Sequence, residues 1–130
     1  MKLNKNIDIL HLDGSAGLTV GVLLFLLQDW VGSLYNLPSS AVLFLATANV
    51  CYGVYALSLA LSDNRKAASI SLLAVANAAW MVVCIVVVLL YAQTANFIGL
   101  TFICLEGIFV SILGLYEWKN RYVLSEVCCA

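Results

Sequence analysis

Residues 82–90 read VVCIVVVLL, a run of apolar side chains that shows none of the alternation in polarity expected of a half-buried β-strand. The run lies inside a longer apolar stretch that extends from about residue 67 to residue 92. Because a helix needs about 20 residues to cross the hydrocarbon layer of a bilayer, this stretch predicts a transmembrane helix. A membrane barrel strand is excluded, since it would alternate in polarity over about 10 residues.

Three further apolar stretches of similar length fill most of the remaining chain. They cover about residues 15–34, 40–61 and 97–118. The polar segments between the stretches are short, so consecutive helices should be antiparallel neighbours. We therefore predict an all-α polytopic membrane protein, an antiparallel bundle of four transmembrane helices with short loops. Residues 1–130 then form a single membrane domain, with a leader at 1–14 and a tail at 119–130.

The composition supports a membrane environment and excludes several classes of protein. Hydrophobic residues make up 64% of the 130 residues and charged residues 10%, whereas soluble domains contain about 45–50% and about 25%. A water-soluble fold of this size could not bury so much apolar surface. The formal net charge of -1 leaves no basic field to hold nucleic acid. Soluble enzymes, disordered tails and nucleic-acid binders are therefore excluded, and the expected partner is the lipid bilayer.

The positive charges predict the orientation of the bundle. All six Lys and Arg residues fall before the first helix, between the second and third helices, or after the fourth: Lys2, Lys5, Arg65, Lys66, Lys119 and Arg121. In a bundle of four antiparallel helices these three regions lie on the same side. Since positive residues are enriched in cytoplasmic loops, we expect both termini in the cytoplasm, and the bacterial inner membrane as the location.

One ionisable side chain is expected near the middle of the bilayer. Glu106 lies ten residues after Asn96 and thirteen before Lys119, which places it near the midpoint of its helix. A charge at that depth costs at least about 2.5–3.5 kcal/mol on insertion scales, so it needs partners inside the bundle. Asn49 and Asn77 should reach nearly the same depth from the second and third helices.

Two interpretations of this polar layer remain open. In the first, Glu106 is the ionisable centre of a midplane site that binds or transports a small solute, ion or lipophilic ligand, lined by Asn49, Asn77 and Trp80. Trp80, one helical turn from Asn77, equally suits plain core packing. In the second, the protein is a non-catalytic interaction or regulatory module, and the polar layer is structural glue between helices.

Two aspartates mark the ends of the expected first helix. Asp13 and Asp29 are candidate mouths of a pathway that leads to Glu106. Asp13 also suits a helix cap, because a negative charge is favoured at a helix N-terminus. Asp29 also suits simple exposure at the level of the lipid headgroups.

Small residues recur at helical spacing and predict close approach of the helices. The stripes are Gly17 and Gly21 on the first helix; Ala46, Asn49, Gly53 and Ala56 on the second; Ala67, Ser71, Ala74 and Ala78 on the third; and Gly107, Ser111 and Gly114 on the fourth. Such stripes let helix backbones pack closely in membranes. They also suit packing against a second copy of the chain, so we expect a homodimer or a complex with another membrane protein.

The cysteines and the single histidine do not predict an enzyme. Of five cysteines, three fall inside the expected spans, while Cys128 and Cys129 lie in the tail, either unmodified or acylated. His11 alone cannot supply a bis-histidine haem or a histidine-based zinc site. No nucleophile and base stand in a recognisable arrangement. We therefore expect no catalytic residues, no metal and no cofactor.

Two short patterns resemble those of a known group of proteins. Asp13 with Gly17 and Gly21, and the segment NAAW at residues 77–80, resemble a loose pattern in small bacterial four-helix membrane proteins of unknown function. The resemblance covers most of the chain but rests on few residues. It implies the four-helix architecture, and it implies no activity.

Overall fold

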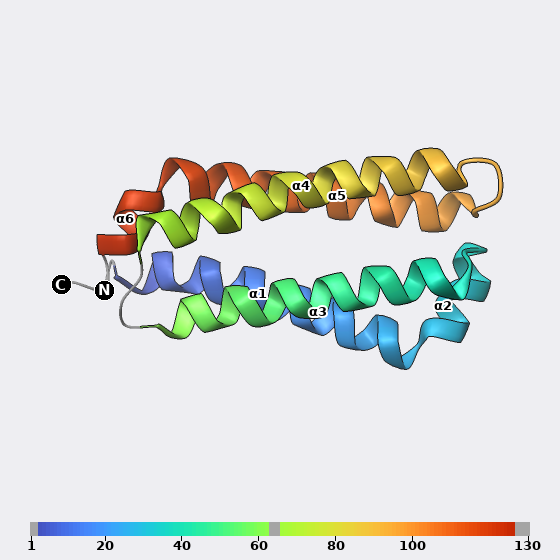
Figure 1. Cartoon of the computed structure of the whole chain (residues 1–130), viewed down its shortest axis with the longest axis horizontal. Helices are drawn as coiled ribbons and strands as arrows, with labels where there is room; N and C mark the ends of the chain where they lie inside the picture. Colours follow the sequence, from blue (N-terminus) through green and yellow to red (C-terminus); the bar gives the residue numbers. More distant parts are fainter. Residues whose placement is uncertain (1–2, 63–65, 127–130) are drawn as a thin grey trace.

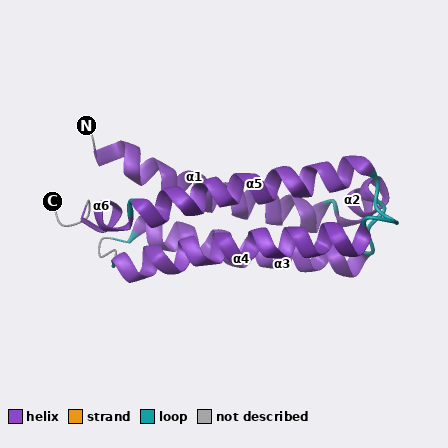
Figure 2. Ribbon diagram, turned by 90° about the horizontal axis from the view of Figure 1, so that it is seen from above, coloured by secondary structure: helices purple, strands orange, loops and turns teal. Residues whose placement is uncertain are grey.

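The computed structural model describes residues 3–62 and 66–126, which form six helices and no strand. The helices are α1 (Leu3–Leu26), α2 (Gln28–Tyr35), α3 (Ser39–Leu61), α4 (Ala67–Tyr91), α5 (Phe97–Lys119) and α6 (Arg121–Glu126). The four long helices lie side by side, and each runs antiparallel to the next along the chain (Figures 1 and 2). The prediction of an all-α bundle is therefore confirmed.

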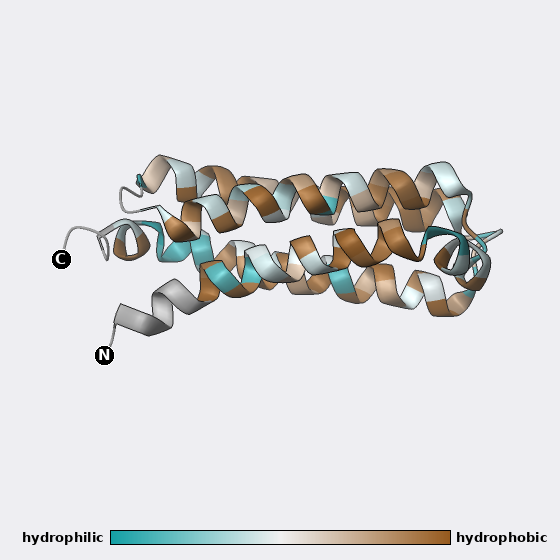
Figure 3. Cartoon of the chain, turned by 90° about the horizontal axis from the view of Figure 1, so that it is seen from below, coloured by the Kyte–Doolittle hydropathy of each residue, from teal (hydrophilic) through white to brown (hydrophobic). Residues whose placement is uncertain are grey.

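Four helical segments are long and apolar enough to cross a membrane. They are Ile9–Leu26, Ser39–Leu61, Ala67–Tyr91 and Phe97–Ser125. Apolar residues predominate along all four long helices (Figure 3). Many large apolar side chains are exposed on the outside of the bundle. Such extensive exposure is unfavourable in water and natural against lipid. The fold is therefore that of an integral membrane protein.

The bundle consists of two helix pairs, which we call the α1–α3 pair and the α4–α5 pair. Figure 1 shows α1 beside α3 in one layer and α4 beside α5 in the other, and the closest packing occurs within each layer. The start of α1, the end of α3, the start of α4 and helix α6 lie at one end of the bundle, the terminal end. Helix α2 and the 92–96 turn lie at the other, the α2 end.

Glycines hold the α1–α3 pair together. A Cβ added at Gly53 would lie 2.4 Å from the backbone nitrogen of Leu18, and one added at Gly21 would lie 2.7 Å from the backbone nitrogen of Val50. The helices can approach this closely because these positions lack side chains. The stripe expected on the second helix, including Ala46 and Gly53, is buried as predicted. On the third helix, Ala78 belongs to the expected stripe of small residues but is exposed and lies outside the contacts between helices.

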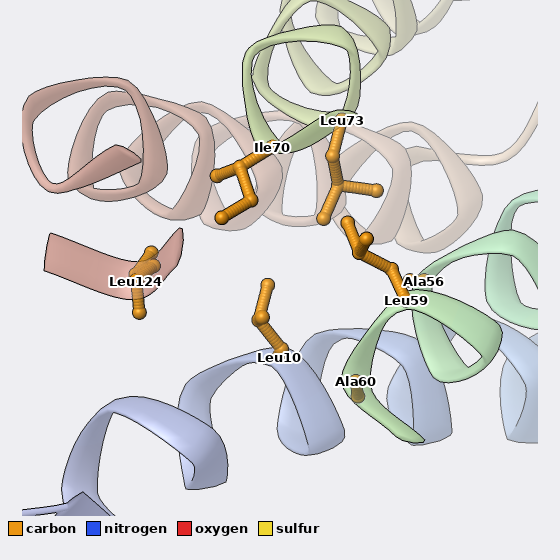
Figure 4. Close-up of a cluster of buried hydrophobic side chains, with 7 residues drawn as sticks. All are labelled: Leu10, Ala56, Leu59, Ala60, Ile70, Leu73 and Leu124. Atoms are coloured by element: carbon orange, nitrogen blue, oxygen red, sulfur yellow. The ribbon is translucent and has the colours of Figure 1, made fainter. Parts of the chain in front are cut away.

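Two apolar clusters join the helix pairs, one near each end of the bundle. The terminal-end cluster contains Leu10, Ala56, Leu59, Ala60, Ile70, Leu73 and Leu124 (Figure 4). The α2-end cluster contains Val31, Leu37, Val42, Leu45, Cys84, Val87 and Ile103. Side chains from both pairs meet in each cluster, so burial of apolar surface fixes the pairs at both ends and leaves room between the clusters for polar groups.

The first helix differs from its predicted span of 15–34. Helix α1 begins at Leu3, inside the expected leader, and ends at Leu26, and α2 follows after a break at Leu27. The physical reason is that Asp13, expected near the start of the helix, is buried in the bundle with only 2% of its surface exposed. The span therefore starts earlier and reaches the α2 end before Asp29.

The remaining long helices occupy the other predicted stretches. Helices α3, α4 and α5 correspond to the expected spans 40–61, 67–92 and 97–118. Residues 1–2 of the expected leader and residues 127–130 of the expected tail, which include Cys128 and Cys129, lie outside the described residues.

Hydrogen bonds from two asparagines link the turn after α2 to the 92–96 turn at the α2 end. The Asn36 side-chain amide donates to the Thr94 carbonyl, and the Asn96 side-chain amide donates to the Leu34 carbonyl at 2.6 Å. The Asn96 backbone N–H also donates to the Tyr35 carbonyl at 2.9 Å. Asn36 has a φ of 54°, a left-handed conformation that asparagine tolerates better than most residues. These bonds hold α2 over the end of the α4–α5 pair.

Candidate functional site

Each of the four long helices contributes one polar side chain to a buried group that we call the four-helix cluster. Its members are Asp13 of α1, Tyr52 of α3, Asn77 of α4 and Glu117 of α5. The Tyr52 hydroxyl donates to Asp13 Oδ2, and Asn77 Nδ2 donates to Glu117 Oε2 at 3.0 Å. Glu117 is 0% exposed and Asn77 is 1% exposed. The cluster is therefore enclosed by the bundle.

One oxygen in this cluster lacks a donor. Glu117 Oε1 is buried and has no hydrogen-bond partner among the described residues. The Asp13 and Glu117 carboxyl groups lie close enough for the charge of one to act on the other. Two neighbouring buried carboxylates repel each other when both are ionised. The arrangement therefore favours a pair in which one carboxyl group is protonated.

Glu106 lies in a second polar group, nearer the α2 end, which we call the Glu106 site. Trp80 Nε1 donates to Glu106 Oε1 at 2.9 Å, and Asn49 Nδ2 donates to the same oxygen at 3.4 Å. Asn49 Nδ2 also donates to the Leu45 carbonyl of its own helix at 2.9 Å. No donor among the described residues contacts Glu106 Oε2. This carboxyl group is half-buried and keeps one oxygen available.

The charge of Glu106 also affects a side chain outside the spans. The pKa of the Tyr35 hydroxyl in α2 is raised, first by burial and then by the negative charge of Glu106. Raising this pKa keeps the hydroxyl neutral around pH 7. The negative potential of the Glu106 site therefore extends toward the α2 end of the bundle.

A cavity of about 490 Å³ lies between the two helix pairs and includes residues of both polar groups. Glu106, Asn49 and Trp80 line it from the Glu106 site, while Asp13, Tyr52 and Asn77 line it from the four-helix cluster. The rest of the wall is mostly apolar or aromatic: Ala16, Gly17, Val20, Ala48, Cys51, Tyr55, Leu72, Ala76, Ala79, Val83, Phe109 and Val110. Its volume lies within the range of about 300–1,000 Å³ that is typical of small-molecule sites.

The cavity is partly open and carries no positive side chain. Val20, Tyr55 and Leu72 belong to its wall and are also exposed at the surface of the molecule. Among the described residues, no Lys, Arg or His lines it. In the part of the chain that the structure describes, the carboxyl groups that line it are those of Asp13 and Glu106.

The structure brings together some of the side chains predicted for one polar layer and separates others. Asn49 and Trp80 contact Glu106, whereas Asn77 contacts Glu117 instead. All four predicted side chains nevertheless line the same cavity. The expectation that both asparagines would hold Glu106 is therefore wrong, because Asn77 faces the carboxyl group of Glu117, toward the terminal end.

The two candidate mouths have different positions. Asp13 is an internal member of the four-helix cluster rather than a cap at the helix start, because α1 begins ten residues before it. Asp29 lies on α2, is exposed, and is not part of the cavity wall. Of the two candidate mouths, Asp13 lines the cavity and Asp29 does not.

Glu117 is the site residue that sequence reasoning missed. It stands between Tyr116 and Trp118 and close to Lys119, a setting typical of the membrane interface. The spacing in the sequence could have identified Glu117, because Glu117 follows Glu106 by eleven residues, or about three helical turns. Two carboxyl groups on the same face of one helix would have indicated that this face carries buried polar groups along its length.

The described part of the chain contains no group of three or more His, Cys, Asp or Glu residues that could hold a metal ion. Cys84 and Cys104 line a separate apolar groove with Ile85 and Ile108. Cys51 lines the central cavity. The cysteines are therefore divided between two environments.

No known protein family, curated protein or solved structure matches the chain. Its class follows from its own helices, which define a small four-helix integral membrane protein. The structure confirms the four-helix membrane architecture that the resemblance implied.

Proposed function

We propose that the protein binds a small, largely apolar organic cation in the cavity between its two helix pairs. The observation that carries this proposal is the combination, in one cavity, of two carboxyl groups, several aromatic rings and no positive side chain among the described residues. An apolar wall with a few polar groups is typical of small-molecule sites. The carboxyl groups add a preference for positive charge.

The free oxygen of Glu106 supports a cationic ligand. Trp80 and Asn49 both donate to Oε1, which orients the carboxyl group, and Oε2 remains without a donor among the described residues. A ligand ammonium or other cation can supply that missing partner. Because the surroundings are largely apolar, the charge interaction is stronger there than it would be in water.

Aromatic rings support the same class of ligand. Trp80, Tyr52, Tyr55 and Phe109 contribute to the cavity wall. Aromatic faces attract organic cations, and each such contact contributes about 0.5–2 kcal/mol depending on how far the cation is desolvated. A ligand with both apolar surface and delocalised positive charge therefore suits this wall better than a hydrated metal ion.

The openings of the cavity favour entry from the bilayer. Its exposed wall residues lie within the helices that cross the membrane, so a lipophilic ligand could reach the cavity sideways from the lipid. The proposed activity is binding, and movement of the ligand between the bilayer and an aqueous side, without chemical change. We propose that it operates in a bacterial inner membrane with both termini cytoplasmic, since Lys66, Lys119 and Arg121 lie at the terminal end.

Binding of radiolabelled tetraphenylphosphonium to the purified protein tests this proposal. The wild type should bind the cation saturably by equilibrium dialysis, and Glu106→Gln should weaken binding at least about tenfold, corresponding to about 1.4 kcal/mol. Asp29→Asn is the matched control, because it removes an exposed carboxyl group outside the cavity wall and should leave the affinity unchanged. Absence of saturable binding to the wild type, or equal weakening in both variants, would contradict the proposal.

A second candidate function has one observation in its favour. Trp80 and Asn49 hydrogen-bond Glu106, so this polar group can serve as glue in a non-catalytic module that interacts with another membrane protein. That candidate predicts that Glu106→Gln changes the stability of the bundle, or the formation of a complex with a second copy or another protein. It predicts no effect on an organic cation, so the dialysis experiment separates the two functions.

A further inference from the structure

We propose that Asp13 and Glu117 share one proton and that a cation entering the cavity displaces it, so that ligand binding exchanges a cation for a proton. The exchange rests on the proposed function, whereas the shared proton rests on the arrangement of the four-helix cluster and does not depend on the proposed function. Glu117 does not line the cavity, but its partners Asp13 and Asn77 do.

The position of the proton follows from the hydrogen bonds that are already present. Asp13 Oδ2 accepts from the Tyr52 hydroxyl, and Glu117 Oε2 accepts from Asn77. Glu117 Oε1 is left buried without a donor in the part of the chain that the structure describes. A proton on this oxygen would donate to the Asp13 carboxylate, which gives Oε1 its missing interaction and joins the two carboxyl groups.

The side chains that hydrogen-bond Asp13 and Glu117 are neutral, so the positive charge available to balance these two carboxyl groups is a proton. Helix α1 brings Asp13, α3 brings Tyr52 and α4 brings Asn77 to Glu117 on α5, and the groups that act on Glu117 are Asp13 and Asn77. Tyr52 and Asn77 are neutral donors. In the described part of the chain, none of the groups that act on Glu117 carries a positive charge. Since two buried carboxylates at close range repel strongly, sharing one proton between them is the favourable arrangement.

The proton and the ligand compete because Asp13 belongs to both sites. Asp13 lines the cavity and is also the neighbour of Glu117 in the four-helix cluster. A cation that contacts Asp13 stabilises both carboxylates in the ionised form, and the proton leaves Glu117 Oε1 for the solvent. Charge is conserved in this step, since one positive charge enters as another leaves. By linkage, a lower pH must weaken cation binding to the same extent that the cation promotes proton release.

Infrared spectroscopy of the purified protein tests the shared proton. The carbonyl stretch of a protonated carboxylic acid is separate from the bands of carboxylates. The wild type at neutral pH should show this stretch, and both Glu117→Gln and Asp13→Asn should lose it. Glu106→Gln is the control and should retain it, because Glu106 is not part of the pair. Absence of the band in the wild type, or its survival in both variants of the pair, overturns the inference.

The exchange is tested on the wild type, which avoids any dependence on the folding of variants. Addition of tetraphenylphosphonium should remove the carboxylic acid band and release about one proton per bound cation into weakly buffered solution. Saturable binding with no proton release and an unchanged band overturns the exchange while leaving the proposed function standing. Loss of the band on adding sodium chloride alone also overturns it, because the site would then be selective for a small inorganic ion. If dialysis shows no cation binding, the proposed function fails. The carboxylic acid band of the wild type and its variants then still tests whether Asp13 and Glu117 share a proton.

Discussion

Gly53→Ala is expected to destabilise the bundle by about 1–3 kcal/mol, the usual cost of overpacking a tight interface. The added Cβ would lie 2.4 Å from the backbone nitrogen and 2.7 Å from the Cα of Leu18, and 2.9 Å from the Gly14 carbonyl oxygen. These are backbone atoms, so no side-chain rotation can relieve the contact. Helices α1 and α3 must therefore move apart, and the position of Asp13 relative to Tyr52 changes with them.

Gly107→Ala is the matched control for this substitution. Its Cβ would lie 3.3 Å from Cys84 Cβ, a contact that a shift of a few tenths of an ångström relieves. We expect its effect on stability to stay within about 1 kcal/mol. Unfolding by sodium dodecyl sulfate in mixed micelles, followed by circular dichroism, measures both variants. Equal midpoints for the two variants would show that the α1–α3 contact is looser than described here.

Asn77→Asp is expected to cost about 3–5 kcal/mol at neutral pH, as other unpaired buried charges do. The substitution hardly changes the volume of the side chain, but it removes the donor to Glu117 Oε2 and adds a third carboxyl group to the four-helix cluster. Asn77 is 1% exposed, so water cannot screen the new charge. The bundle should regain stability on acidification, because protonation removes the repulsion.

Asn36→Asp provides the same chemical change at an exposed position. Asn36 lies at the α2 end, and its amide donates to the Thr94 carbonyl, so the expected loss is the ordinary value of about 0.5–1.5 kcal/mol for one hydrogen bond. Unfolding of both variants at neutral and acidic pH gives the comparison. A similar and pH-independent loss in the two variants would mean that the four-helix cluster tolerates a third charge, contrary to our description.

The helices could be predicted from the sequence because each stretch is continuously apolar and bounded by polar residues. Glu106 was identifiable because it is a charged residue with apolar residues on both sides in the fourth stretch. Glu117 was not, because its neighbours Trp118 and Lys119 suggest a position at the membrane surface. Its burial depends on α6 and α1 covering the terminal end of the bundle, where Leu124 and Leu10 are both 0% exposed.

The division of the polar residues into two groups also depends on tertiary structure. Equal distances from the helix starts place Asn49 and Asn77 at similar depths, but depth does not determine which carboxyl group each amide meets. The long side chain of Trp80 reaches Glu106, while Asn77 reaches Glu117. These choices follow from the packing of the helix pairs, which a hydropathy pattern does not specify.

We propose that a cavity accessible to water and to an organic cation lies between the two helix pairs. Cys51 and Cys104 test it directly, because both are exposed but only Cys51 lines this cavity, whereas Cys104 lines the apolar groove beside Cys84. Thiol reagents react with the thiolate, which is the nucleophile and which forms only where water or polar groups support its charge.

The decisive measurement is the labelling rate of proteins that retain only Cys51 or only Cys104, each exposed to a small methanethiosulfonate reagent in lipid vesicles. The account predicts that Cys51 reacts faster than Cys104, although it lies farther from the nearest end of its helix, and that tetraphenylphosphonium slows labelling of Cys51 alone. Labelling of Cys51 that is no faster than that of Cys104, or that is unaffected by the cation, would contradict the existence of the proposed binding cavity.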